Sequence, residues 1–342
     1  MTDIIEKPRH SETSNNSYAT RPNDVSALGV VDFADCDQCS RYPNRWSKIR
    51  EHISAPAAEF MGAFVLCLLG CGGNCQANLS ANKSISASPA GDAVTSNLSW
   101  ALGLSLGVWL SMNHSGGHLN PAVTIAFTTV RGFPWRKVPI YILAQLLGAL
   151  CGAGVVYATY FHAIDIAEGG SNIRTIAVSG GFFGTYAADY LTSVSAFFAE
   201  FIGSAMLITG IFMATDKKNG PAPPGVVPVA IFLTLLGISS ALGMDTGAAL
   251  NPARDLGPRI LTAMVGYGSA VFTFRNQYWL WCPILGPIFG MMVAAFFYDA
   301  MLYRGAESIT NKPTEEAERY HLHSCARRNK TSWGCRNSLM IE

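Results

Sequence analysis

Two segments of this chain carry the same tripeptide, Asn-Pro-Ala. One lies in SGGHLNPAVT (115–124) and the other in AALNPARDLG (248–257). Asparagine is a favoured helix N-cap, and proline suits the first position of a helix. Each tripeptide therefore predicts the start of a helix, and we expect a functional role for its members, which are Asn120, Pro121, Ala122, Asn251, Pro252 and Ala253.

The helices that begin at the two Asn residues are expected to be short. They run only to about Val130 and Ala263, so at about 1.5 Å per residue each covers about half of a bilayer. A helix N-terminus carries roughly half a positive charge, and two that meet at the membrane centre would repel cations and protons. The amides of Asn120 and Asn251 are expected to face a narrow pore as donors.

The residues just before each Asn are expected to be extended. Unpaired backbone is tolerated at membrane depth only where it lines water. We therefore predict that carbonyl groups from these two segments line one wall of the pore. The residues that supply them are Gly116, Gly117, His118, Gly247 and Ala249, with Ala248 between the last two.

Two acidic residues lie at matching positions inside apolar segments. Glu59 occurs in AAEFMGAFVL (57–66) and Glu200 in FAEFIGSAML (198–207). A carboxylate inside a membrane is costly and needs partners. Since two symmetric carboxylates suit two symmetric loops, we predict that each accepts hydrogen bonds from backbone N–H groups of one Asn-Pro-Ala loop. A proton-coupling site in a transporter is the alternative.

The apolar segments that must position these residues are long and almost free of charge. The chain has 342 residues, of which 49% are hydrophobic and 14% charged, against about 25% charged in a soluble domain. Because a spanning helix needs about 20 apolar residues, we predict six spans, at about 54–75, 98–113, 138–162, 192–213, 226–243 and 279–303. The alternative is a large soluble all-helical protein, but its helices would keep a charged stripe.

The pattern of spans and Asn-Pro-Ala segments occurs twice. With three spans in each half, the halves 51–165 and 190–304 face opposite ways, which predicts a site at the midplane between them. The pairs Gly148/Gly152 and Gly286/Gly290 predict close helix crossings. The tails at 1–50 and 305–342 flank the channel domain at 51–304, and the first is expected to be disordered. Lys and Arg gather on the side of both tails, which predicts that both termini are cytosolic.

Composition and side-chain types argue against several other functions. The net charge of +1 indicates no nucleic-acid partner. The membrane region holds no nucleophile, base and acid set, so an enzyme is not expected. A metal site and a cofactor are not expected either, because the candidate ligands outside the spans are scattered over both tails. These ligands are Cys36, Cys39, His321, His323, Cys325 and Cys335.

The two Asn-Pro-Ala segments resemble those of the major intrinsic protein family, the aquaporins and aquaglyceroporins, and the resemblance covers about 52–303. It implies an all-α membrane protein with six transmembrane helices, two re-entrant half-helices and an inverted 3+3 repeat. It also implies a homotetramer with one pore in each protomer. Asp255, grouped here with the loop-supporting carboxylates, follows Arg254 and points to the glycerol-conducting branch. ALGMDTGAALNPARDLGPR and RNQYWLWCPILGPIFG look most like segments of fungal aquaglyceroporins.

The resemblance further implies a four-residue selectivity filter, whose members are Trp100, Ser239, Ala248 and Arg254. Orthodox water channels place Phe at the first position and His at the second. Ser239 and Ala248 are small, so a wide ring is expected, with an apolar wall at Trp100 and a donating wall at Arg254. Glycerol facilitators often carry Gly where Ser239 stands and an aromatic residue where Ala248 stands, so larger polyols, urea or hydrogen peroxide are further candidate solutes.

The function implied is a passive channel for glycerol, small polyols and water in a lipid bilayer, with the plasma membrane as the expected location. It would exclude ions and protons. The alternatives are an aquaporin selective for water or hydrogen peroxide, a secondary transporter, and a non-conducting structural membrane protein.

Overall fold

The computed structural model describes residues 42–305 and 308–320 of the chain. The chain divides into two units, 1–51 and 52–342. All residues of the cavities described below belong to the second unit. The Cys and His residues of the two tails that were weighed as metal ligands lie outside the described residues.

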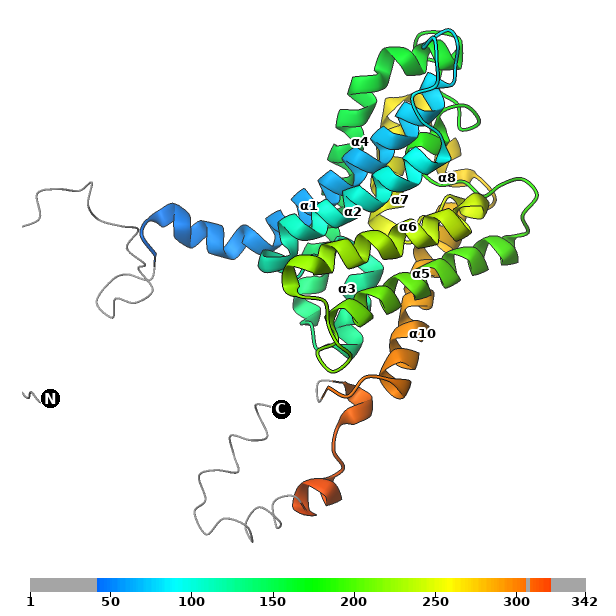
Figure 1. The fold of residues 1–342 in the computed structure, drawn as a ribbon. Coiled ribbons are helices and arrows are strands. Elements are labelled where there is room, and N and C mark those ends of the chain that lie inside the picture. Colours follow the sequence, from blue (N-terminus) through cyan, green and yellow to red (C-terminus); the bar gives the residue numbers. More distant parts are fainter. Residues whose placement is uncertain (1–41, 306–307, 321–342) are drawn as a thin grey trace, which may run out of the picture. The chain divides into compact units, whose positions relative to one another are not determined.

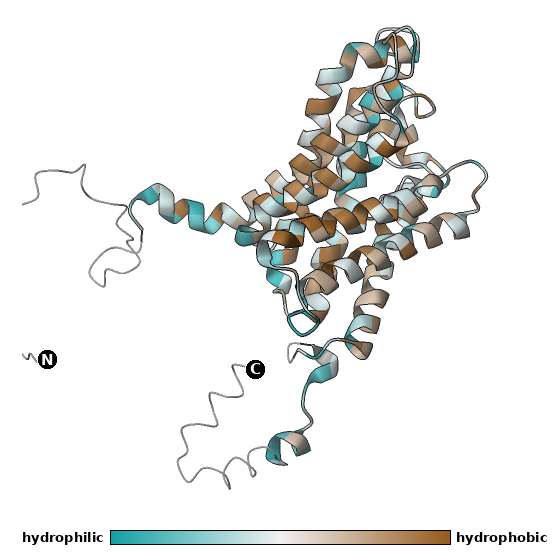
Figure 2. Ribbon diagram, viewed as in Figure 1, coloured by the Kyte–Doolittle hydropathy of each residue, from teal (hydrophilic) through white to brown (hydrophobic). Residues whose placement is uncertain are grey.

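Six helical segments are long and apolar enough to cross a membrane, as the sequence predicts. Figure 2 shows apolar residues along each of them. Five are the helices α1 (Arg45–Ser80), α2 (Ala93–Ser115), α4 (Val138–Glu168), α5 (Ser193–Thr215) and α6 (Val227–Thr246). The sixth segment joins α9 (Tyr278–Leu280), a π-helical turn η7 (Trp281–Leu285) and α10 (Gly286–Met301).

Several spans extend further than the charge-free tracts predict. Helix α1 begins at Arg45, so residues 45–50 are helical and the expectation of a disordered segment up to residue 50 is wrong there. Asn44 supports this start, because its Oδ1 accepts a hydrogen bond from the Ser47 N–H at 2.8 Å. The absence of charge marks the part of a helix suited to a bilayer, whereas capping and backbone propensity decide where the helix begins.

Two short helices, α3 (Pro121–Val130) and α7 (Pro252–Thr262), begin at the Asn-Pro-Ala segments as predicted. Asn120 accepts a hydrogen bond from the Ala122 N–H at 2.8 Å, and Asn251 accepts one from the Ala253 N–H at 2.9 Å. A π-helical turn η6 (Ala263–Tyr267) and α8 (Ala270–Thr273) follow α7. The structure also has four single helical turns, which are η3 (Trp135–Lys137), η4 (Gly180–Phe182), η5 (Pro224–Val226) and η8 (Ile309–Asn311). Residues 315–320 are helical as well, and the described part of the chain contains no strand.

The helices of the two halves interlock (Figure 1). Helix α4 of the first half packs against α7 of the second, and α10 of the second half packs against α3 of the first. Helices α2 and α6 also pack against each other across the halves. Each short helix is therefore held by a long helix from the opposite half, so the site between α3 and α7 requires both repeats.

Within each half, glycines allow two long helices to pack closely at equivalent places. A Cβ atom at Gly148 would lie 2.1 Å from the Phe60 carbonyl oxygen, and one at Gly290 would lie 2.1 Å from the Phe201 carbonyl oxygen. No larger residue fits at such a distance without moving the backbone. The prediction of close crossings at the glycine pairs of α4 and α10 is confirmed.

Candidate functional site

Two cavities meet at Asn120, near the N-terminus of α3. The first, here called the Arg254 cavity, has a volume of about 320 Å³ and is lined by parts of α1, α2, α5, α6, α7 and the α4–α5 loop. The second, called the His118 cavity, has a volume of about 410 Å³ and is lined by parts of α2, α3, α5, α6 and the α5–α6 loop. They share the lining residues Leu104, Asn120 and Leu207. Helices α1, α2, α3, α5, α6 and α7 therefore line two adjoining cavities, which have the first Asn-Pro-Ala segment in common.

Glu59 of α1 holds the loop before α3. Its carboxylate accepts hydrogen bonds from the backbone N–H groups of His118 at 2.9 Å and Leu119 at 2.7 Å. The Ser115 hydroxyl at 2.6 Å and the Gln145 amide at 2.7 Å also donate to it. The side chain is fully buried, so four donors replace the water that a carboxylate loses on burial.

Glu200 of α5 holds the loop before α7 in the same way. The N–H groups of Ala249 at 2.9 Å and Leu250 at 2.8 Å donate to its carboxylate. The Thr246 hydroxyl donates at 2.5 Å. The Ser115 contact of the first half thus has its counterpart at Thr246, whereas the Gln145 contact has no counterpart among the described side chains that bond to Glu200.

The two loops are not extended, so that expectation is wrong. Leu119 and Leu250 have left-handed φ values of 52° and 53°. Successive N–H groups of an extended chain point to opposite sides, but each glutamate binds the N–H groups of two adjacent residues. The backbone must turn to bring both to one carboxylate. Positive φ values occur at Gly116, Gly117, Leu119, Gly247, Ala248 and Leu250.

The segments expected to supply carbonyl groups do border the cavities. The first segment lines the His118 cavity and the second lines the Arg254 cavity. The residues concerned are Gly116, Gly117, His118, Gly247, Ala248 and Ala249. The His118 ring also packs at 5.0 Å from that of Phe127, and its Nδ1 lies 3.2 Å from the Thr124 hydroxyl. Through these contacts His118 holds the loop against α3.

The two Asn side chains tie the loops to each other. Asn120 donates from Nδ2 to the Leu250 carbonyl, and Asn251 donates from Nδ2 to the Leu119 carbonyl, both at 2.8 Å. A carboxamide has two N–H donors, so this bond uses one of the two. Asn120 lines both cavities and Asn251 lines the Arg254 cavity. The remaining members of the tripeptides, Pro121, Ala122, Pro252 and Ala253, are buried at the helix starts.

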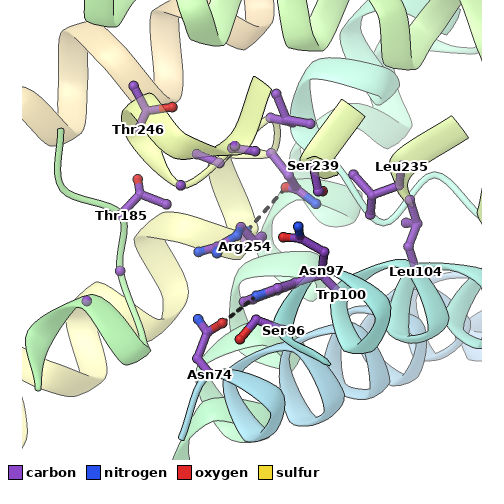
Figure 3. A pocket seen from close by; sticks show the side chains of 18 of the residues that line it. Asn74, Ser96, Asn97, Trp100, Leu104, Thr185, Leu235, Ser239, Thr246 and Arg254 are labelled. Carbon is purple, nitrogen blue, oxygen red and sulfur yellow. Dashed lines mark hydrogen bonds between the residues drawn. The ribbon is translucent and has the colours of Figure 1, made fainter. Parts of the chain in front are cut away.

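The four residues of the expected filter line the Arg254 cavity together (Figure 3). Trp100 comes from α2, Ser239 from α6, Ala248 from the loop before α7, and Arg254 from α7. The guanidinium carbon of Arg254 lies 3.8 Å from the centre of the Trp100 ring. These two side chains therefore stack into one wall, and the expectation of separate apolar and donating walls is wrong. An indole face attracts a cation, which favours the stack.

Asp255 and the α4–α5 loop support Arg254. Arg254 donates from Nη1 to the Phe183 carbonyl at 3.3 Å. Two residues further along the loop, Thr185 donates to Asp255 from its N–H at 2.7 Å and from its hydroxyl at 2.6 Å. Arg259 completes this buried group by donating from Nε to Asp255 at 2.8 Å. The carboxylate after Arg254 thus joins the loop to α7.

Residues of this loop and polar residues of α1 and α2 also line the Arg254 cavity, although they were not predicted from the sequence. They are Asn74, Asn78, Ser96, Asn97, Gly181, Gly184, Thr185 and Tyr186. Asn74 offered a signal, since it is a polar residue inside a charge-free tract. The loop offered a weaker one in its Gly- and aromatic-rich segment SGGFFGTY (179–186).

The sequence profile of the family described as "Major intrinsic protein" matches residues 45–298. The chain belongs to the major intrinsic protein family. As a member of this family it is a membrane channel and not an enzyme. The resemblance stated from the two Asn-Pro-Ala segments is confirmed.

Relatives of this channel include a protein named an aquaporin and two whose names refer to glycerol. Aquaporin-6 of Laccaria bicolor is 54% identical over 273 residues, which are 80% of this chain and 87% of that protein. The aquaglycerol porin AQY3 of Saccharomyces cerevisiae is 39% identical over 312 residues, which are 91% of this chain and 47% of that protein. The X-ray structure of the aquaglyceroporin from Plasmodium falciparum aligns with a TM-score of 0.65 and 32% identity, covering 73% of this chain and 97% of that one.

Proposed function

We propose that this channel passively conducts glycerol and other small uncharged solutes together with water, and that it excludes ions and protons. The observation that carries the proposal is the composition of the Arg254 cavity. The stacked Trp100 and Arg254 form one wall, and the small side chains Ser239 and Ala248 line the same cavity.

This arrangement suits a small polyol. Glycerol has a carbon chain that gains from contact with an apolar surface and hydroxyl groups that need hydrogen-bond partners. The Trp100 ring supplies apolar surface, and the guanidinium of Arg254 supplies donors. Large residues at Ser239 or Ala248 would take the space of the carbon chain, which is why their small size favours a polyol over water alone.

Charge in the cavities favours exclusion of cations. None of the described residues that line the two cavities is Asp or Glu, whereas Arg254 and Lys217 are cationic. Helices α3 and α7 begin where the cavities meet, and each N-terminus carries a partial positive charge. A cation entering the passage would meet positive potential with no carboxylate to offset the loss of its hydration.

The Asn pair supports passage of neutral solutes. Each amide keeps one N–H beyond the bond that links the loops, and Asn120 lines both cavities. These N–H groups are suited to donate to the oxygen of water or glycerol where the cavities meet. A solute oxygen that accepts from them is not free to accept from a neighbouring water, which disfavours proton transfer along a water chain.

Two relatives favour glycerol as a solute. The yeast protein is named an aquaglycerol porin and the Plasmodium structure an aquaglyceroporin, whereas the Laccaria relatives are named aquaporins. Asp255 after Arg254, noted above as a mark of the glycerol-conducting branch, agrees with the first two names.

The proposal extends to the assembly of the channel, its membrane and its orientation. We infer a homotetramer with one pore in each protomer, placed in the plasma membrane with both termini in the cytosol. The distribution of Lys and Arg between the spans supports this orientation. Residues 51–304 would form the channel domain, with tails on the cytosolic side.

Reconstitution of the channel in liposomes tests which solutes pass through it. Light scattering is followed after an outward osmotic step made with sucrose, and then after a step made with glycerol. We expect rapid shrinkage in both, and rapid reswelling only with glycerol, at a rate far above that of empty liposomes.

Other outcomes identify the alternatives. Shrinkage without reswelling would indicate a water-selective aquaporin, and the role given to Ser239 and Ala248 would be wrong. Hydrogen peroxide uptake into the same liposomes, read with an enclosed peroxide-sensitive dye, would then test a peroxide channel. No response to any solute from folded protein would indicate a non-conducting structural protein.

A further inference from the structure

Asn74 is a polar residue in the membrane-spanning helix α1, and both ends of its carboxamide are engaged. Its Oδ1 accepts a hydrogen bond from the Trp100 indole Nε1–H at 3.2 Å. Its Nδ2 donates to the Phe182 carbonyl at 3.1 Å. Figure 3 shows the side chain beneath Trp100 at the edge of the Arg254 cavity, with the first of these bonds drawn.

The chemistry of the two partners requires a group like this one. An indole N–H can only donate, and a carbonyl oxygen can only accept. A carboxamide offers an acceptor and a donor side by side, so it satisfies both partners at once. The orientation of the Asn74 amide is fixed by the same argument, because the reversed orientation would pair donor with donor and acceptor with acceptor.

Helix α1 also provides the surface on which Trp100 lies. A Cβ atom at Gly70 would be 2.1 Å from Cε3 of Trp100, so the indole lies directly against the helix backbone there. Asn74 is four residues later and therefore on the same helix face. Gly70 makes room for the ring, and Asn74 holds its polar edge.

The other partner of Asn74 leads to Arg254. Phe182 and Phe183 are adjacent in the α4–α5 loop; the carbonyl of the first binds Asn74 and that of the second binds Arg254 Nη1 at 3.3 Å. Arg254 in turn lies 3.8 Å from the centre of the Trp100 ring. Asn74, Trp100, Arg254 and the loop thus form a closed circuit of contacts around one side of the cavity.

We propose that Asn74 determines the solute specificity of this channel as a positioning residue, by holding Trp100 and the Arg254-binding loop in one arrangement. The proposal rests on the glycerol function proposed above. With its N–H bound to Asn74, the indole presents only apolar surface to a solute. Without Asn74, the indole N–H and the Phe182 carbonyl lose their partner and turn toward the cavity, which obstructs a three-carbon solute more than water.

The test compares glycerol and water permeability per reconstituted full-length channel. Asn74→Leu keeps the size of the side chain and removes both hydrogen bonds. We expect the ratio of glycerol to water permeability to fall about fivefold, which corresponds to about 1 kcal/mol. The matched control is Gln76→Leu, which also removes an amide from α1 but lies outside both cavities; its ratio should stay at the unsubstituted value.

A double-mutant cycle separates positioning from general destabilisation. Trp100→Phe removes the indole N–H, so Asn74→Leu should lower the ratio clearly less in that background than in the unsubstituted channel. An equal effect in both backgrounds, or an unchanged ratio in folded Asn74→Leu protein, would overturn the proposal. If the leucine variant does not fold, Asn74→Ala removes the same two bonds without branched bulk, and the same criteria apply.

A second measurement does not depend on conduction. The Trp100 indole N–H resonance is identified by its loss in Trp100→Phe protein carrying ¹⁵N-labelled tryptophan. In Asn74→Leu it should shift and exchange with solvent faster, and an unmoved resonance would contradict the inferred hydrogen bond. If the unsubstituted channel passes water but not glycerol, the proposed function fails by itself, and this resonance still decides whether Asn74 holds Trp100.

Discussion

Arg254 is buried against an aromatic ring and bonded to a loop carbonyl, so its charge is held at one place in the Arg254 cavity. Ser239 and Ala248 line the same cavity with small side chains. At the residue scale, the charge of the cavity and the space in it are therefore set by different side chains, and each can be changed without the other.

The charge at Arg254 is expected to exclude cations. Arg254→Val removes it, and we expect measurable conductance of monovalent cations or protons where the unsubstituted channel has none, because a repulsive potential has been lost. Ion flux into liposomes, followed with a pH-sensitive dye and an imposed potential, measures this. Arg254→Lys keeps the charge and is the control; a leak of equal size in both variants would assign exclusion to another part of the channel.

The size of Ser239 is expected to admit glycerol. Ser239→His places a bulky ring in the Arg254 cavity, and we expect glycerol permeability to fall at least about tenfold while water permeability stays within about threefold, an effect of about 1.4 kcal/mol on glycerol alone. Stopped-flow light scattering gives both rates. Ser239→Gly, which adds space, should retain glycerol flux. Unchanged glycerol flux in the histidine variant would mean that the narrowest point lies elsewhere.

At the scale of elements, the two short helices depend on two buried carboxylates. Glu59 and Glu200 each accept two adjacent backbone N–H groups from the loop that precedes α3 or α7. Those loops have left-handed residues that carry side chains, Leu119, Ala248 and Leu250. Such conformations are disfavoured in isolation, so the carboxylates stabilise a backbone that the local sequence does not prefer.

Glu59→Gln tests this dependence. A carboxamide has one acceptor oxygen and turns its NH2 group toward a donor, so at least one of four bonds is lost and the fold should be destabilised by about 2 kcal/mol. Glu200→Gln faces three donors and should be affected no more than Glu59→Gln. Thermal unfolding in detergent, monitored by the loss of the size-exclusion peak, gives the unfolding midpoint of each variant and so ranks their stabilities. Unchanged midpoints for both would show that the loops hold their shape without the charge.

The contact between α1 and α4 depends on Gly148. Gly148→Ala brings a Cβ atom to 2.1 Å from the Phe60 carbonyl oxygen, and because both atoms are fixed by backbone we expect a clear fall in the unfolding midpoint. Gly237→Ala is the control: it lies in α6 with no atom within 4 Å of the added Cβ. Since alanine favours helix over glycine by up to about 1 kcal/mol, the control should equal or exceed the unsubstituted midpoint.

At the scale of the whole molecule, the inverted repeat brings α3 and α7 together and leaves no acidic side chain among the described residues that line the two cavities. A coupled transporter needs groups that bind the driving ion or proton. The glutamates at matching positions, Glu59 and Glu200, already accept hydrogen bonds from loop N–H groups and from neighbouring side chains.

Glycerol flux should therefore follow the glycerol gradient alone. We expect equal influx rates into liposomes with and without an imposed pH gradient, sodium gradient or membrane potential, since none of these has a binding group to act through. Radiolabelled glycerol uptake measures the rate. Accumulation above the external concentration under any of the three gradients would indicate a secondary transporter.

The sequence by itself determined the features that depend on neighbouring residues. Six spans follow from charge-free apolar tracts, and the starts of α3 and α7 follow from Asn120 and Asn251 as N-caps before proline. These are local signals, because the cost of exposing apolar surface and of leaving helix N–H groups unpaired is set within a few residues. Even there, the start of α1 at Arg45 was misplaced because lack of charge does not mark a helix end.

Only the tertiary structure decided how the cavity is built. The left-handed loops arise because each glutamate, fixed on another helix, binds two successive N–H groups. The stack of Arg254 on Trp100, and the link from Asn74 to Phe182, join residues from four separate parts of the chain. Such contacts depend on where long helices place their side chains, and neither apolar periodicity nor capping carries that information.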